Sequence, residues 1–431
     1  MKIKKKKVLI KINGRNTKLN LSKNQTSYLK EKFNISNIED LDDTIVKLLK
    51  EKLMTIKDVR QTGKKHYKLW DILMYVILAS FSNVDSWYDI HDFVEIHQTW
   101  LKRFLKMTGG IPTRQTIERV MSLIDAKELE NVLTSFFIMI TTLNTTTKDI
   151  VNIDGRVDCG SSRNKTFYKE KIKPLNSLNA YSNNYGICLA SEMIDDKTNE
   201  IPTIPDILKR LSIKDVIVTW DALNTQTKNI EAVIAGEGDY VVPIKGNQEN
   251  FFNDLKLYFD DKKLETIIAG NTHSAYLKQK EKSHSSIITY EYFQTNDVDW
   301  YFDKDKWKGL KTIGVVKKTI EKAEETAIEF RYYISSLDIN IQLFSKSIRN
   351  HWSVENKLHW HLDFTFKEDN NTTVNKNALF NLQLVNKFCL GILNSVKPFY
   401  DNISLQRIRK YLSACYEEEF VNLICYLSLS K

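Results

Sequence analysis

The stretch "DIVNIDG", residues 149–155, has the composition of a buried β-strand that ends at an acidic residue. Ile and Val favour extended backbone, and no charged residue interrupts the run between its two aspartates. Asp154 follows the apolar run, and Gly155 behind it permits the backbone to turn away. We therefore predict that Asp154 lies at the carboxyl end of a strand, where open α/β sheets bind ligands.

Downstream of this stretch, short β-branched runs alternate with helical runs. Residues 177–182 and 185–194 are separated by only two asparagines, which indicates a hairpin. Residues 215–222 and 239–246 are further strand candidates, and each follows a helical stretch. Three meandering strands followed by two strand–helix crossovers predict a mixed α/β sheet. The order matches that of the ribonuclease H-like fold.

The hydrophobic period divides the chain into five parts. Helical patterns at 69–81, 86–107 and 113–140 predict an all-helical N-terminal module, and the β-like runs after a polar helix at about 248–262 predict a β-rich insertion. The expected parts are a basic N-terminal arm with a short helical region at 1–59, the helical module at 60–145, the first part of a ribonuclease H-like core at 146–263, the β-rich insertion at 264–338, and the second part of the core with C-terminal helices at 339–431.

Charge and cysteine content limit the classes of partner and compartment. The 431-residue chain carries 63 basic and 54 acidic residues, a net charge of +9 that favours an anionic partner. Residues 1–18 hold eight Lys or Arg and no acid, as in a phosphate-binding arm or a solvated tail. The five cysteines form no CxxC pair, so we expect neither a zinc ribbon nor disulfides, and a reduced cytoplasmic setting. We expect no membrane association, since the apolar run at 131–147 is short and ends in polar residues.

Two further acids complete a candidate metal site. Asp221 ends the fourth predicted strand, and the helical stretch "NHWSVENKLHWHLDF" (350–364) places His351, Glu355, His359 and Asp363 four residues apart on one face. Three carboxylates around one point repel each other unless cations share the site. Oxygen ligands favour Mg²⁺ or Mn²⁺, and a pair of such ions supports phosphodiester chemistry. We expect two ions held by Asp154, Asp221 and Glu355.

Other interpretations of these residues remain open at this point. Either aspartate alone is equally typical of a helix cap or a turn. The histidines could orient Glu355, contact a phosphate, or ligate zinc, although no HExxH motif and no nearby Cys supports zinc. Asp363 could pair with a histidine or cap the helix end. The whole face could also be a polar helix surface with Trp352, Leu358 and Leu362 packing opposite.

Several neighbours of the acids carry both a functional and a structural interpretation. Lys245 could reach a phosphate or leave a strand into a turn. Asn247 and Gln248 could contact DNA or serve as turn residues. Trp220 and Trp352 could stack on bases, but buried aromatic residues are commoner than exposed stacking platforms.

A series of sequence blocks spans about residues 60–395: "SWYDIHDF", "WLKRFL", "GIPTRQTIERV", "NIDGR", "NEIPTIPDIL", "VIVTWDALNTQ", "GDYVVPIKGNQ", "WKGLKTIG", "RYYISSL" and "IRNHWSVENKLHWHLDFTFKED". Through these blocks and their order, the chain resembles the DDE-type insertion-sequence transposases, and within them the H-repeat-associated family.

The resemblance implies that Asp154, Asp221 and Glu355 form the catalytic, metal-binding triad that cuts and joins DNA ends. It also implies a homo-oligomer, with a dimer on DNA expected, that binds terminal repeats and target DNA in the cytoplasm. The expected supporting or DNA-binding residues are His351, His359, Arg349, Lys245, Asn356 and Trp352.

The chain departs from the family pattern at several positions. Cys159, Thr372, Val374 and Asn386 stand where the family commonly has Arg, and Leu379 with Phe380 replaces a Pro-Glu pair. Each lost Arg is interpreted as a lost phosphate contact. Two rival functions follow: a catalytically silent DNA-binding descendant, and a ribonuclease H-like nuclease without strand transfer.

Overall fold

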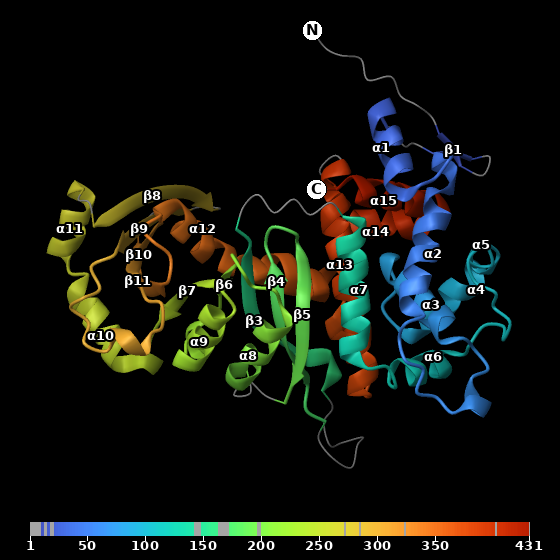
Figure 1. Ribbon diagram of the computed structural model, residues 1–431, viewed down its shortest axis with the longest axis horizontal. Coiled ribbons are helices and arrows are strands. Elements are labelled where there is room, and N and C mark those ends of the chain that lie inside the picture. The colour runs from blue at the N-terminus through green and yellow to red at the C-terminus, as the bar shows by residue number, and fades with distance from the viewer. Residues whose placement is uncertain are drawn as a thin grey trace, which may run out of the picture.

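The computed structural model describes residues 10–430 except 13–14, 18–20, 142–147, 163–171, 196–199, 271–272, 284–285, 323–324 and 401–402. The fold is mixed α/β, as the sequence predicts, with one large sheet and a separate body of helices (Figure 1). The basic arm expected at 1–18 lies mostly outside the described residues. Its described part forms the short antiparallel pair β1 (Ile10–Ile12) and β2 (Arg15–Thr17).

Nine strands form the large sheet, in the order β5-β4-β3-β6-β7-β11-β10-β9-β8. β3 pairs antiparallel with β4 and parallel with β6, and β6 pairs parallel with β7. The bounds are β3 Ile150–Asp158, β4 Leu175–Ser182, β5 Ile187–Ile194, β6 Ile217–Thr219, β7 Asp239–Ile244, β8 Ser274–Ser283, β9 Ser286–Thr295, β10 Thr312–Glu321 and β11 Thr326–Ser335. The first five strands follow the predicted order of a hairpin meander and two crossovers.

The region predicted as a β-rich insertion is continuous with this sheet. β11 pairs antiparallel with β7, with Tyr332 opposite Ile244, and β10, β9 and β8 follow outward. The region begins later than predicted, because Asp260 caps a helix, α11 (Asp261–Ala269), by accepting a bond from the Lys263 amide. The polar helix expected at 248–262 is therefore two helices, α10 (Glu249–Tyr258) and α11.

Helices cover both faces of the sheet. One face packs against α8 (Glu200–Arg210), α9 (Thr227–Ala235), α10 and α11, with Ile204, Ile230 and Phe251 in the shared core. The other face packs against α12 (Ile341–His351) through Phe344 and Ile348. The chain that follows α12 is thereby brought close to Asp154 on β3, a central strand of the sheet.

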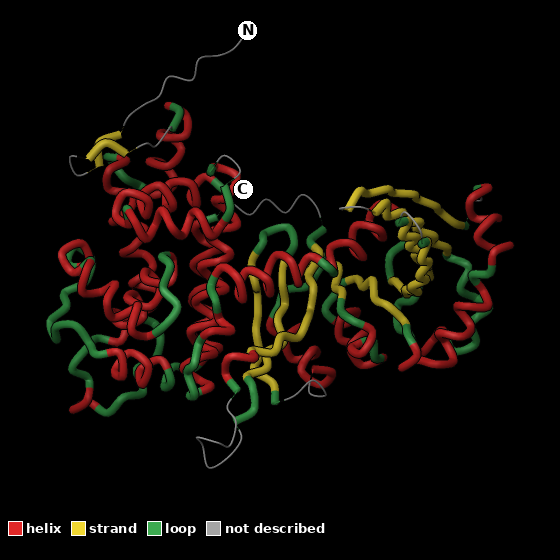
Figure 2. The backbone as a smooth tube through the Cα atoms, turned by 180° about the vertical axis from the view of Figure 1, so that it is seen from behind, coloured by secondary structure: helices red, strands yellow, loops and turns green. Residues whose placement is uncertain are grey.

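The remaining helices form a second body beside β5, seen at the right of Figure 1 and from behind in Figure 2. Helices from both ends of the chain share its core. The sequence analysis grouped the C-terminal helices with the sheet, but they pack mainly with the N-terminal helical module. Their bounds are α1 Lys23–Phe33, α2 Leu41–Leu53, α3 Leu69–Phe81, α4 Trp87–Ile96, α5 Gln98–Leu101, α6 Arg114–Met121, α7 Ala126–Ile140, α13 Lys376–Val396, α14 Leu405–Ala414 and α15 Tyr416–Leu429.

Two long helices expected in this body are each broken. The stretch 86–107 bends at His97, and Trp100 packs edge-on against Tyr416 and Phe420 of α15. The stretch 113–140 breaks before Asp125, whose side chain accepts the Glu128 amide and starts α7. No helix in the described part of the chain has the length and apolar character to cross a membrane.

Candidate active site

Asp154 lies in the middle of β3, not at its end as predicted. β3 continues through Gly155 to Asp158 and pairs with β4 from Val151 to Asp158. Its other neighbour, β6, pairs only with Ile150–Asn152 and stops at Thr219. Asp154 therefore reaches the open rim because the adjacent strand is short, and Gly155 does not turn the chain.

Asp221 follows β6 and begins the loop beside Asp154. Its carboxylate accepts the Asn224 amide at 3.2 Å. Two side chains from the β7 end hold this loop: Asn247 donates to the Ala222 carbonyl at 2.7 Å, and Gln248 to the Thr225 carbonyl at 3.0 Å. These contacts agree with the turn-residue interpretation of Asn247 and Gln248.

Glu355 lies on a widened continuation of α12. The chain from Glu355 to His359 and from His361 to Thr365 forms two π-helical turns, with i→i+5 backbone bonds such as Phe366 to His361. Wide turns of this kind are frequent at functional sites. The helix predicted from the four-residue ladder is present, but its winding is wider than an α-helix.

The structure brings Asp154, Glu355 and His359 together from distant parts of the chain. Their ligand atoms all lie within 4.8 Å of one another. The His359 Nδ1 atom is 3.7 Å from an Asp154 oxygen and 3.4 Å from a Glu355 oxygen. Asp221 is not in this closest group, but its charge acts on both Asp154 and His351.

The electrostatics of this site suit a bound cation. Burial, together with the nearby carboxylates of Glu355, Asp221 and Glu200, raises the pKa of Asp154 to about 8. A divalent cation would relieve both effects by neutralising the clustered charge. The carboxylate oxygens of Asp154, Glu355 and Asp221 therefore fit Mg²⁺ or Mn²⁺, with His359 beside them.

His351 is placed to support the loop at the end of β6. Its Nδ1 atom is 3.3 Å from the Thr219 hydroxyl, which itself donates to Asn152 at 2.9 Å. The imidazole is therefore the donor to Thr219. Burial lowers the pKa of His351 to about 4, so the ring is neutral at physiological pH. A neutral, hydrogen-bonded ring suits the orienting interpretation better than phosphate contact.

Asp363 pairs with an arginine, and neither sequence interpretation of it was correct. The buried Arg156 side chain donates to Asp363 at 2.5 Å and to Glu368 at 2.5 Å. Arg156 lies on β3 two residues after Asp154. This double ion pair fastens the end of the Glu355 helix to the strand that carries Asp154.

Three of the supporting residues predicted from the sequence line one cavity of about 470 Å³. Arg349, Trp352 and Asn356 lie on its helical side, opposite tyrosines and basic residues of β9 to β11. Arg349 pairs with Glu281 and covers the Tyr290 ring, and the Arg331 guanidinium lies 4.6 Å from the centre of the Trp352 ring. The cavity thus combines positive charge and aromatic surface beside Glu355.

The remaining supporting residue, Lys245, and the buried Trp220 lie outside this cavity. Lys245 is exposed at the end of β7, where its charge acts on His351. Trp220 is fully buried and donates to the Thr225 hydroxyl at 3.2 Å, which agrees with its structural interpretation.

Three of the family departures lie in the interior. Leu379, Phe380 and Asn386 are buried on α13, and Asn386 donates to Glu368 at 2.9 Å. The interpretation of Asn386 as a lost phosphate contact is therefore wrong, because that position faces the core. Thr372 and Val374 are exposed.

Sequence reasoning missed two features of the site. Glu200, in the block "NEIPTIPDIL", is buried beside Asp154, and only the tertiary structure reveals this proximity. Trp360 and Phe364 stack at 4.6 Å on the exposed side of the Glu355 helix. Their four-residue spacing was a signal that could have been found in the sequence.

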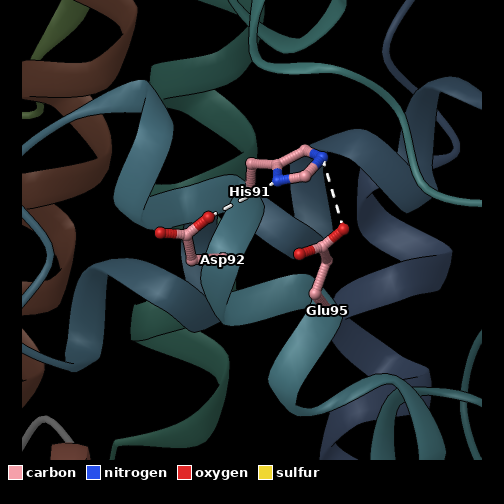
Figure 3. A group of neighbouring side chains, drawn as sticks. All are labelled: His91, Asp92 and Glu95. Carbon is pink, nitrogen blue, oxygen red and sulfur yellow. Dashed lines mark ion pairs between the residues drawn. The ribbon is translucent and has the colours of Figure 1, made fainter.

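A second acidic and imidazole group lies on α4, far from this site in sequence (Figure 3). His91 contacts Asp92 at 3.6 Å and Glu95 at 3.9 Å, all on one exposed helical turn. Exposed ion pairs of this type are common and contribute little. We assign no ligand to this group.

The raised pKa of Asp154 predicts a stability change with pH. Because the folded protein holds this proton up to about pH 8 and the unfolded chain releases it near pH 3.8, the metal-free protein should lose stability as pH rises between these values. Thermal unfolding in chelator at pH 5 and pH 8 should show a larger loss for wild type than for Asp154→Asn, by about 1 kcal/mol or more. The control Asp206→Asn should lose as much stability between pH 5 and pH 8 as wild type. An equal loss of stability in wild type and Asp154→Asn would contradict the prediction.

Comparison with known proteins identifies the family. Residues 141–390 match the model described as "Transposase DDE domain", and residues 50–137 match the "DDE_Tnp_1-associated" model. YncI of Escherichia coli O157:H7, which carries the name transposase, is 31% identical over 87% of this chain and 94% of its own. The H repeat-associated transposase homologue YhhI of Escherichia coli (strain K12) is 32% identical over 82% of this chain and 92% of its own. Among solved structures, a match to the piggyBac transposase synaptic complex with hairpin DNA covers 93% of this chain and 81% of the piggyBac chain, with a TM-score of 0.35 and 10% sequence identity. The chain therefore belongs to the DDE-type transposases, in the group that contains the H repeat-associated proteins.

Proposed function

We propose that this transposase binds the ends of its element, cuts DNA in a reaction that requires a divalent metal, and joins the cut ends to target DNA. Asp154, Asp221 and Glu355 are the proposed catalytic metal ligands. The observation that carries the proposal is the convergence of Asp154 and Glu355 within one small group of ligand atoms, with the Asp221 charge beside them. Three separate segments of the chain supply these acids.

Two Mg²⁺ or Mn²⁺ ions held by these carboxylates would supply activation of a water or 3′-hydroxyl and stabilisation of the leaving oxygen. The chain's own residues position the ligands. His359 is buried, with Nδ1 directed at Asp154 and Glu355, and its Nε2 atom has no hydrogen-bond partner among the described residues. An imidazole that donates from Nδ1 toward the two carboxylates would hold both in place.

The fold and surface fit a substrate that is DNA. We propose that the strands β5-β4-β3-β6-β7 form a ribonuclease H-like core, since their order and directions follow that plan. The cavity beside Glu355 offers arginine, lysine and aromatic side chains, which bind phosphates and stack on bases. We further propose that the helical module and β8 to β11 contact the terminal repeats and that a dimer holds two ends together.

The exposed pair of aromatic residues after Glu355 provides a test of this DNA surface. Trp360 is 49% and Phe364 50% exposed, although both are large apolar side chains. Replacing both by Ala should weaken binding of DNA with an unpaired end by about tenfold, as expected for loss of one stacked base. Gel-shift titration measures this. Phe302→Ala, at a side chain 96% exposed in another loop, is the control. Unchanged affinity in the double variant would remove this face from the DNA surface.

The full proposal is tested with purified protein and a plasmid that carries the DNA flanking its own gene. Mapped cuts at flanking repeats that need Mg²⁺ or Mn²⁺, with cut 3′-ends joined to a second DNA, would support a transposase. Cuts without joining would favour a nuclease. Binding without cutting under every metal condition would favour the silent DNA-binding descendant. Thr372 and Val374, which are exposed and stand where the family commonly has Arg, also favour this alternative.

A further inference from the structure

A fourth carboxylate, Glu200, lies directly behind the proposed active site. Glu200 is the first residue of α8, and only 5% of its surface is exposed. A Cβ atom added to Gly155 would lie 2.2 Å from a Glu200 carboxylate oxygen. The absence of a side chain at Gly155 therefore makes room for Glu200 against the backbone of the strand that carries Asp154.

The same carboxylate also contacts the loop that carries Asp221. The second Glu200 oxygen accepts a bond from the Asn224 side chain at 2.9 Å. The Asn224 backbone amide in turn donates to Asp221 at 3.2 Å. Glu200 thus stands between Gly155, next to one catalytic acid, and Asn224, bonded to the other.

Burying the Glu200 carboxylate costs folding free energy, because a charged group is stabilised less in the protein interior than in water. Its charge lies near enough to Asp154 to act on that carboxylate, and like charges repel strongly in a poorly solvated environment. A glutamine would make the same contact with Asn224 without this repulsion. The repulsion becomes favourable attraction only if a cation binds among the acids.

We propose that Glu200 is a positioning residue of the active site, which fixes the Asp221 loop relative to Asp154 and adds negative charge that strengthens divalent cation binding. This inference rests on the proposed metal-dependent function. It assigns two separable contributions to one side chain: the hydrogen bond to Asn224 and the charge.

Two substitutions separate these contributions. Glu200→Gln keeps the size and an acceptor for Asn224 but removes the charge, and Glu200→Ala removes both. Asp206→Asn removes a charge from the exposed side of the same helix and is the matched control. The readouts are Mn²⁺ binding by electron paramagnetic resonance and DNA cleavage as a function of Mn²⁺ concentration, with thermal unfolding to establish that each variant folds.

We expect Glu200→Gln to raise the Mn²⁺ concentration for half-maximal binding and cleavage by about three- to tenfold. Saturating Mn²⁺ should recover most of its rate. Glu200→Ala should stay at least about tenfold slower even at saturating Mn²⁺, because the Asp221 loop is no longer held. A purely structural side chain would not produce this split between metal dependence and maximal rate.

The inference is wrong if Glu200→Gln and wild type have the same Mn²⁺ dependence, or if both variants lose rate equally at saturating Mn²⁺. The proposed function fails separately, if wild type neither binds Mn²⁺ at a site lost in Glu355→Gln nor cuts DNA. The wild-type measurement therefore distinguishes the two failures.

Discussion

Glu355→Gln should cut DNA at least about a thousandfold more slowly than wild type at any Mg²⁺ or Mn²⁺ concentration, and should still bind DNA. The substitution keeps the shape of the side chain and removes one of the two carboxylates nearest to His359. Loss of a catalytic metal ligand removes several kcal/mol of transition-state stabilisation, which corresponds to this factor in rate. Cleavage of labelled element ends and gel-shift binding are the two measurements.

The matched control is Glu231→Gln on the exposed surface of α9. It makes the same chemical change away from the sheet rim and should cut DNA at the wild-type rate. A Glu355→Gln protein that retains cleavage within tenfold of wild type would exclude Glu355 as a metal ligand. Loss of DNA binding together with cleavage would instead indicate that Glu355 acts through the folded structure.

Arg156→Met should destabilise the protein by about 3–5 kcal/mol, the cost of leaving a buried acid without its partner. Arg156 is buried and bonded to both Asp363 and Glu368, and Glu368 is itself buried. Burial alone would lower the pKa of Arg156, but the Glu368 and Asp363 carboxylates outweigh it and raise that pKa, so the guanidinium stays charged. Chemical denaturation, read as the midpoint and slope, measures the change.

The double variant Arg156→Met with Glu368→Gln tests the stated cause. If the cost comes from the uncompensated Glu368 charge, the double variant should be more stable than Arg156→Met alone, because no buried charge then lacks a partner. Equal or greater destabilisation in the double variant would show that Arg156 acts by packing. Cleavage by the folded double variant would still be slowed, since the Glu355 helix loses its attachment to β3.

Much of the secondary structure follows from local pattern. The helix expected at 69–81 has those bounds, and the hairpin expected around the two asparagines is β4 and β5. Errors occur where one residue changes the local outcome without disturbing the hydrophobic period. Asp125 and Asp260 each start a new helix within a stretch predicted as continuous. The capping signals were present, but the apolar period outweighed them.

The candidate site was predictable only in part. Asp154 and Glu355 were chosen from a strand pattern and a helical ladder, and the structure brings them together. The reason given for Asp154 was wrong, since a short neighbouring strand opens the rim. Arg156 and Glu200 could not be assigned because their partners are remote in sequence: Glu368 in one case, Gly155 and Asn224 in the other.

Hydrophobic period, charge placement and turn residues were sufficient for the α/β class, the helical module and the acids worth testing, because these depend on residues within a few positions of one another. The tertiary structure alone decided that β8 to β11 extend the sheet, that the C-terminal helices join the N-terminal ones, and that His359 and Glu200 flank Asp154. These outcomes depend on strand pairing and on burial shared between distant segments. Such contacts leave no periodic trace in a single sequence.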